Sequence, residues 1–156
     1  MENEPINLQR DRLFHALAEF ESTVEAPCVP GELEGWFEAV DAAFQRLRPM
    51  VVEQVERIHP QQFAAIGQAD EELFRRVERM QQEDAALQME FDQLGDDIAT
   101  LERSAENLEP DEAKLREAFD AFVDKAIKCI IRVRTQEEAI RTWLMESFTR
   151  DRGAVD

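Results

Sequence analysis

The sequence has no tyrosine and only five glycines and six prolines among its 156 residues. Runs of β-branched residues are also nearly missing, and the pairs Val51-Val52 and Ile130-Ile131 are the nearest approach to one. Strands favour β-branched and aromatic residues, and the turns of a sheet protein use glycine and proline. Glutamate, alanine, leucine, arginine and glutamine dominate instead, and these are good helix formers. We therefore predict an all-α protein.

Positive charge is scarce. The chain carries 18 Lys and Arg against 35 Asp and Glu, a formal net charge of −17. This charge argues against binding to nucleic acid or to anionic membrane surfaces, and favours basic partners or simply a well-solvated surface. No apolar run is long enough to span a bilayer. With 44% hydrophobic residues the chain can still bury a core.

Cysteine is limited to Cys28 and Cys129, which form no metal-binding motif. Free thiols in a reducing compartment are the simplest interpretation, and Cys129 is expected in the core because it follows the apolar pattern of its helix. The first twelve residues, MENEPINLQRDR, are polar and acidic and do not have the pattern of a signal or transit peptide. We expect a cytoplasmic protein.

Three breaks divide the chain into four helical patterns. The breaks are APCVPGE (26–32), HPQQFAAIGQAD (59–70) and NLEPDEA (107–113). Between them apolar residues recur every three or four positions, so each helix has one apolar stripe. We predict a single domain, 1–156, forming an up-down-up-down four-helix bundle. Its helices are expected at about 5–26, 32–59, 69–106 and 110–149.

Each apolar stripe is interrupted by one polar residue. The interruptions, in chain order, are Arg10, Gln54, Asp84 and Gln136. Counting residues from the connections places them at similar heights in the bundle, provided that the 59–70 stretch is not simple helix. A stripe that drifts around its helix would also bring polar residues to its edge, and this alternative stays open. If all four point inward they need partners, because buried polar groups are rarely left unpaired.

The frame resembles the hemerythrin-like, cation-binding family of four-helix bundles over nearly the whole chain. RDRLFHAL is similar to the start of the first family helix, RVERMQQEDAAL to the third, and LMESFTRDRGAVD to the C-terminus of some bacterial members. The resemblance implies a bundle whose relatives hold a di-iron centre in the core. Their ligands are a His on helix one, His-x-x-x-Glu on helices two and four, and a His after an acidic residue on helix three.

The ligand pattern of that family is not kept in this chain. The corresponding residues are Arg10, the pair Gln54 and Ile58, Asp84, and the pair Gln136 and Ile140. Isoleucine offers no ligand atom and glutamine is a poor ligand for iron, so we expect no cofactor. We hypothesise instead that Arg10 pairs with Asp84 across the bundle and that the two glutamines complete the hydrogen bonds.

Two histidines remain as candidate ligands. Glu56 and His59 have the Glu-x-x-His spacing of ferritin-like sites, but Glu56 lies off the stripe and His59 precedes Pro60 at an expected helix end. His15 also lies off its stripe and defines no site alone. We therefore expect a non-enzymatic interaction or regulatory module, with a protein partner or a homo-oligomer both compatible with the sequence. The alternative is an iron- or oxygen-binding protein with an altered ligand set: Asp84, Gln54, His15, His59 and Glu56.

Overall fold

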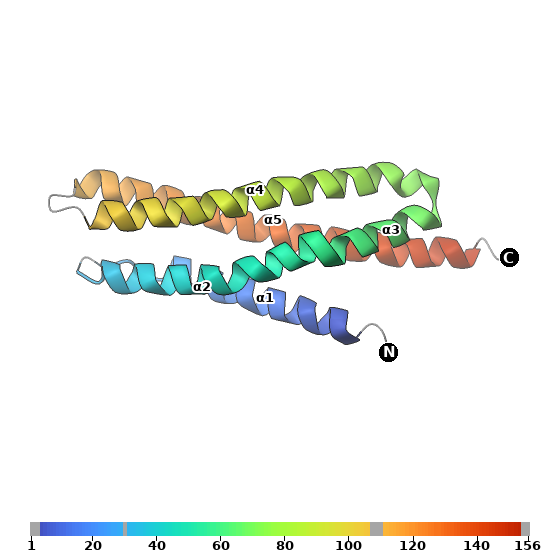
Figure 1. Cartoon of the computed structure of the whole chain (residues 1–156), viewed down its shortest axis with the longest axis horizontal. Helices are drawn as coiled ribbons and strands as arrows, with labels where there is room; N and C mark the ends of the chain where they lie inside the picture. Colours follow the sequence, from blue (N-terminus) through green and yellow to red (C-terminus); the bar gives the residue numbers. More distant parts are fainter. Residues whose placement is uncertain (1–3, 30, 107–110, 154–156) are drawn as a thin grey trace.

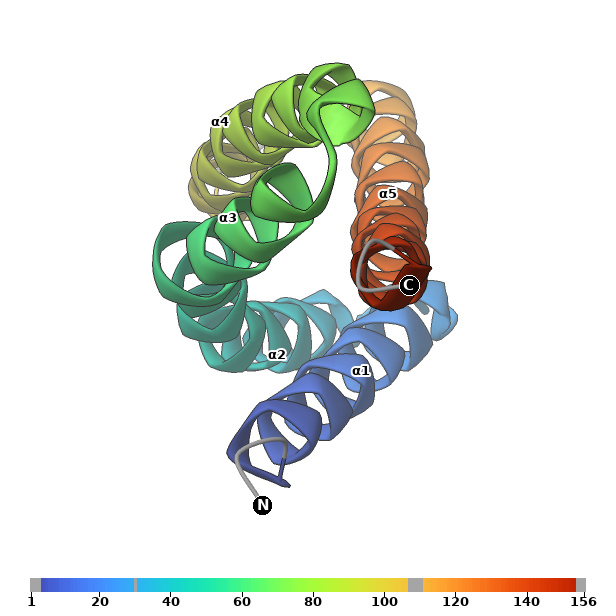
Figure 2. The ribbon, with the colours of Figure 1, turned by 90° about the vertical axis from the view of Figure 1, so that its right-hand side faces the viewer.

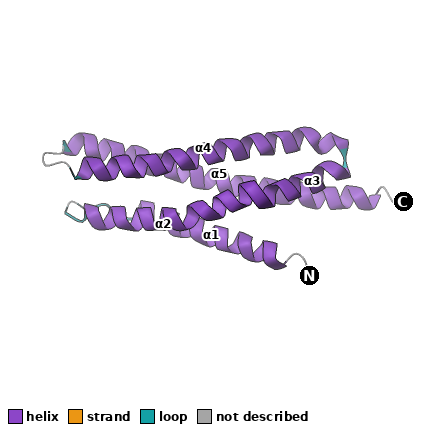
Figure 3. Ribbon diagram, in the orientation of Figure 1, coloured by secondary structure: helices purple, strands orange, loops and turns teal. Residues whose placement is uncertain are grey.

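The computed structural model describes residues 4–29, 31–106 and 111–153, and this part of the chain is helical apart from short turns (Figures 1 and 3). Its elements are α1 (Glu4–Glu25), α2 (Leu33–Glu53), the π-helix η1 (Gln54–Ile58), α3 (His59–Ala69), the 3₁₀ turn η2 (Glu71–Leu73), α4 (Phe74–Ala105) and α5 (Glu112–Gly153). No strand occurs among the described residues, which confirms the all-α prediction. The break predicted at 107–113, with the expected helix start at 110, lies partly outside the described residues.

Four helical segments pack against one another, as predicted, because α2, η1 and α3 follow without interruption and form one segment. α1 lies against α2 and α5, and α4 lies against α2 and α5. α3 packs against α5 and α4, so the second segment contacts the others along most of its length. Figure 2 shows the segments end on, surrounding a common axis. No described helix combines the length and the apolar character needed to cross a bilayer.

The predicted break at 59–70 is wrong, because the helix continues through Pro60 to Ala69. Proline lacks an N–H group and its ring crowds the carbonyl four residues earlier, which here belongs to Glu56. The chain accommodates Pro60 with the wide turn of η1, in which the backbone N–H of His59 bonds to the carbonyl of Gln54, five residues earlier. The true end of this segment is at Asp70, whose side chain accepts a 3.0 Å hydrogen bond from the backbone N–H of Glu72.

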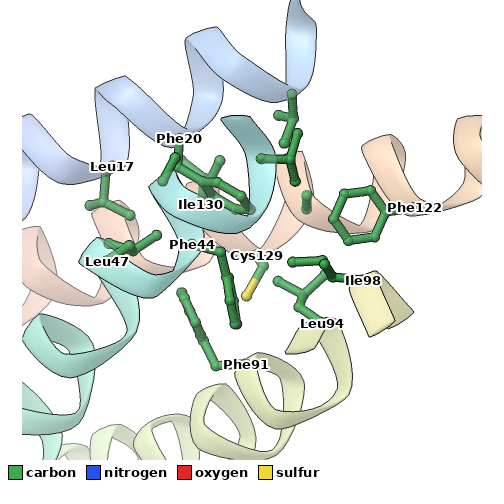
Figure 4. Packing of buried hydrophobic residues seen from close by; sticks show 14 of the residues in the cluster. Leu17, Phe20, Phe44, Leu47, Phe91, Leu94, Ile98, Phe122, Cys129 and Ile130 are labelled. Carbon is green, nitrogen blue, oxygen red and sulfur yellow. The ribbon is translucent and has the colours of Figure 1, made fainter. Parts of the chain in front are cut away.

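Two separate hydrophobic clusters fill the interior. The larger joins α1, α2, α4 and α5 and includes Phe20, Phe44, Phe91 and Cys129, which point toward one another in Figure 4. The rings of Phe44 and Phe91 stack with their centroids 6.1 Å apart. The smaller cluster joins α3, α4 and α5: Phe63, Ile66, Leu73, Val77, Met80 and Ile140. Along α4 and α5, which enter both clusters, the buried residues between them are polar: Asp84, Gln136 and Glu137.

Candidate functional site

Five buried polar side chains lie between the two hydrophobic clusters and form what we call the polar layer. Its members are Gln54, His59, Asp84, Gln136 and Glu137, each between 2% and 6% exposed. η1 and α3 contribute the first two, α4 the third, and α5 the last two. The prediction that Gln54, Asp84 and Gln136 point inward is confirmed. Ile58 and Ile140 are buried beside them as core residues.

His59 is the centre of the polar layer. Its Nδ1 lies 2.9 Å from Oδ2 of Asp84, and its Nε2 lies 2.6 Å from Oε1 of Glu137. A neutral imidazole can donate from only one ring nitrogen, whereas the protonated ring donates from both. Both nitrogens face carboxylate oxygens, so this geometry favours the imidazolium form.

The electrostatics of His59 agree with its geometry. Burial alone would lower the pKa of His59, because a charged ring loses its hydration. The hydrogen bonds to Asp84 and Glu137, and the negative charges of the two carboxylates, outweigh this effect and raise its pKa from 6.5 to about 9. At neutral pH the layer therefore holds one internal cation between two anions.

The two glutamines complete the hydrogen bonding of the carboxylates. Nε2 of Gln136 donates to Oδ1 of Asp84 at 2.9 Å and to the backbone carbonyl of Met80 at 2.7 Å. Nε2 of Gln54 donates to Oε1 of Glu137 at 3.2 Å. Each carboxylate thus accepts one hydrogen bond from the imidazole and one from a glutamine amide. Buried charged groups need such partners, because they have lost their hydrogen bonds to water.

The layer leaves almost no free space. The cavity beside it, which Gln54, His59, Gln136 and Glu137 help to line, has a volume of about 10 Å³. This is near the smallest volume that accommodates one water molecule. A substrate would not fit without separation of the helices.

The hypothesised pair between Arg10 and Asp84 is wrong. The Arg10 guanidinium instead bonds to Oε1 of Glu138 at 2.6 Å, and it lies 5.1 Å from the centre of the Phe14 ring. Glu138 is 61% exposed in its side chain, so this ion pair lies at the surface. The cation that compensates Asp84 is His59, because η1 and α3 bring the imidazole directly to α4.

The sequence analysis placed His59 at a helix end and missed its buried position beside Asp84, because it assumed regular α-helical spacing. The buried positions Val51, Gln54 and Ile58 follow that spacing, and His59, Phe63 and Ile66 follow it again with an offset of one residue. η1 contains the extra residue that produces the offset. The available signal was Pro60, followed by a resumed helical pattern rather than by a turn. Glu137 was missed because the stripe of α5 is wide enough to bury it together with its neighbour Gln136.

The other candidate ligands do not join the layer. His15 and Glu56 are both exposed, and Glu56 accepts a long hydrogen bond of 3.4 Å from Gln88. Of the alternative metal set, His59 contacts Asp84 and also Glu137, and Gln54 contacts Glu137. The two carboxylates occupy opposite edges of the imidazole ring and do not converge on one point. Within the described residues, no three His, Cys, Asp or Glu side chains are arranged to hold a metal ion.

Comparison of the chain with protein-family models, curated proteins and solved structures found no match. The layer is therefore interpreted from its own chemistry. That chemistry is a hydrogen-bonded and tightly enclosed cluster in which one imidazolium lies between two carboxylates.

Proposed function

We propose that this chain is a non-enzymatic helical bundle of hemerythrin-like type, with up-down-up-down topology, that acts as an interaction or regulatory module. In this proposal the His59 imidazolium takes the place of a metal in the core. The observation that carries it is the position of the His59 ring, with one carboxylate at each ring nitrogen.

The positions of the ligand-type residues support this origin. His59 and Phe63 are four residues apart and their ring centroids lie 5.8 Å from each other, and Val133 and Glu137, also four apart, line the same small cavity. All of these pairs have the spacing of the family's His-x-x-x-Glu pattern, but His59 and Glu137 also keep one of its residue types, whereas Gln54 with Ile58 and Gln136 with Ile140 keep neither. Each pair then keeps one ligand-type residue and replaces the other with an apolar residue, so the ligand set is half lost.

The chemistry of the layer supports a non-enzymatic role. The imidazole and both carboxylates are engaged with one another, and the adjoining cavity is about 10 Å³. Cys129, the other buried reactive side chain, lies in apolar surroundings, and burial raises its pKa to about 12. At neutral pH its thiol is therefore protonated and a poor nucleophile.

Metal analysis tests the proposal. Protein purified without chelators should contain metal far below one ion per chain, because the His59 ring already occupies the position between the two carboxylates and bonds to both. Addition of ferrous iron followed by air should give no near-ultraviolet oxo-bridge band. Stoichiometric iron that is lost in His59→Gln would instead establish the alternative function, an iron- or oxygen-binding protein with an altered ligand set.

A binding role would use the surface. The net charge of −17 favours basic protein partners, and several large apolar side chains are more than half exposed. These are Leu8, Phe74, Met89, Ile131, Met145 and Phe148. The same exposed apolar side chains could instead form the interface of a homo-oligomer. Sedimentation of the chain at high micromolar concentration distinguishes self-association from a monomer that binds another protein.

A further inference from the structure

A cavity of about 900 Å³ lies far along the bundle from the polar layer, where the end of α1 and the start of α2 meet the first turns of α5. This volume is within the range of pockets that bind small organic molecules. Its apolar wall combines side chains from all three helices: Val24, Leu33, Trp36, Phe119, Val123 and Ile127.

The aromatic part of this wall is held in place by its own contacts. Nε1 of Trp36 donates to the backbone carbonyl of Ala26 at 3.1 Å, so the polar edge of the indole is already satisfied. The Trp36 ring meets the Phe119 ring edge to face, with centroids 5.1 Å apart, and the Phe37 ring in the same way at 5.5 Å. The wall is therefore formed before any ligand arrives, which lowers the ordering cost of binding.

Charge at the mouth of the cavity is strongly unbalanced. Four carboxylates line it, from Glu25, Glu112, Asp120 and Asp124, against the single guanidinium of Arg116. Lys128 contacts Asp124 at 2.9 Å, but both side chains are about 70% exposed and such a pair is weak. Carboxylates around an apolar cleft concentrate cations there and repel anions.

We propose that this cavity binds a small amphipathic cation, an amine or quaternary ammonium that carries an alkyl or aromatic group. The apolar body would lie against Trp36 and Phe119, and the positive group would face the carboxylates at the mouth. A fatty acid would place its carboxylate next to four carboxylates of the same charge, which would repel it. A neutral apolar molecule would gain no attraction from these four carboxylates. This inference does not depend on the function proposed above, because the two sites share no residue.

Fluorescence of Trp36 measures binding directly. The probes are dodecyltrimethylammonium, dodecanoate and a neutral dodecyl polyoxyethylene ether, all below their micelle concentrations. The Trp143→Phe variant removes the other tryptophan, which packs against Arg76 elsewhere in the molecule. We expect saturable binding of the cation, with the anion at least about tenfold weaker. No saturable response to the cation, or equal affinity for cation and anion, would overturn the proposal.

Charge-reversal variants separate the cavity from the general acidity of the chain. Asp120→Lys with Asp124→Lys should weaken cation binding at least about tenfold and improve dodecanoate binding. The control is Glu78→Lys with Asp96→Lys, which changes the net charge equally at exposed sites on α4. It should alter cation binding by less than about twofold, because neither residue lines the cavity and salt screens exposed charges that do not contact the ligand. Equal losses in the two variants would mean non-specific attraction and would contradict the proposal.

Cys28 provides an independent readout, because it lines the cavity and is partly exposed, whereas Cys129 is only 1% exposed. The cationic probe should slow alkylation of Cys28 by iodoacetamide, measured by mass spectrometry. This protection should be lost in the Asp120→Lys and Asp124→Lys variant and kept in the control. Saturable binding without protection of Cys28 would place the probe elsewhere and exclude this cavity as its site.

Discussion

At the scale of single residues, the molecule contains two kinds of ion pair, one buried in the polar layer and one at the surface. His59, Asp84 and Glu137 are shielded from water, whereas Arg10 and Glu138 pair at the surface. Removal of one partner from a buried pair leaves an uncompensated polar group, which is far more costly than loss of a surface pair. Side chains with similar hydrogen-bond distances should therefore differ greatly in their effect on stability.

Asp84→Ala should lower the free energy of unfolding by about 3–5 kcal/mol, because it leaves the buried Nδ1 of His59 without an acceptor and removes one of the two acceptors of Gln136. Asp84→Asn should cost less, since an amide oxygen can still accept both hydrogen bonds. Arg10→Ala is the control and should cost less than about 1 kcal/mol. Urea unfolding of the four proteins measures these differences. Equal costs for Asp84→Ala and Arg10→Ala would show that the layer is not the buried cluster described above.

The raised pKa of His59 predicts a pH dependence of stability. A group whose pKa is higher in the folded chain stabilises the fold below its unfolded value, and this stabilisation is lost as pH rises through the folded value. For His59 the contribution should be complete below about pH 6.5 and lost as pH rises through about 9. The difference corresponds to roughly 3 kcal/mol.

Chemical unfolding between pH 6 and 10 measures this loss. The control is His59→Gln, which should be less stable at pH 6 but should lack most of the decline toward pH 10. Asp84 and Glu137 are the charged groups that face His59, so Asp84→Asn should also shift the decline to lower pH. A wild-type profile parallel to that of His59→Gln would contradict the assignment of the internal cation.

At the scale of elements, the apolar stripes predicted the helices because burial of one face is what stabilises a helix in a protein. Gln54, Asp84 and Gln136 were found inside for the same reason. The partner of Asp84 could not be found in this way, because η1 changes the helical register by one residue just before His59. Periodicity describes regular helix only, and the site lies at the irregular turn. Such π turns are frequent at functional positions.

Deletion of one residue from η1 tests this description of the element. Without the exposed Glu56, the buried positions of α2 and α3 would fall on one continuous α-helical stripe. Pro60 would then lie in the interior of a regular helix, at a cost of about 3 kcal/mol. The deletion combined with Pro60→Ala should therefore fold with nearly wild-type stability, and the deletion alone should be less stable by about that amount.

The matched control is deletion of the exposed Gln81 within the regular helix α4, which should prevent folding because it turns one half of α4 away from the core. Circular dichroism and urea unfolding measure all three variants. If the combined variant at Glu56 and Pro60 were as damaged as the Gln81 deletion, η1 would not be a one-residue insertion in an otherwise regular helix.

At the scale of the whole molecule, composition was sufficient for the all-α class, and the breaks and apolar stripes were sufficient for four packed helices. The break predicted from proline and glycine at 59–70 was wrong, because burial of Phe63 and Ile66 outweighs the local preference of Pro60 and Gly67. The wide cavity at the other end of the bundle had no signal in the sequence. It depends on how the end of α1 and the start of α2 pack against α5, and the periodicity of single helices does not describe that packing.

The net charge of the whole chain leads to the last prediction. Many arginines already contact a carboxylate, as Arg132 contacts Glu83 at 2.8 Å and Arg150 contacts Asp70 at 2.6 Å. The excess of acidic over basic residues, 35 against 18, leaves many carboxylates that only repel one another in the compact state. Salt weakens both the attraction within the ion pairs and the repulsion among the excess carboxylates. Because each exposed ion pair contributes little to stability, the weaker repulsion should have the larger effect.

The melting temperature should therefore rise as sodium chloride increases from about 10 mM to about 150 mM, a range over which the Debye length falls from about 30 Å to about 8 Å. The Glu78→Lys and Asp96→Lys variant carries four fewer net negative charges and should show a smaller rise. Differential scanning calorimetry at constant pH measures both slopes. A melting temperature that falls with salt would mean that the surface ion pairs together outweigh the repulsion, and the acidic surface would then stabilise the bundle instead of opposing it.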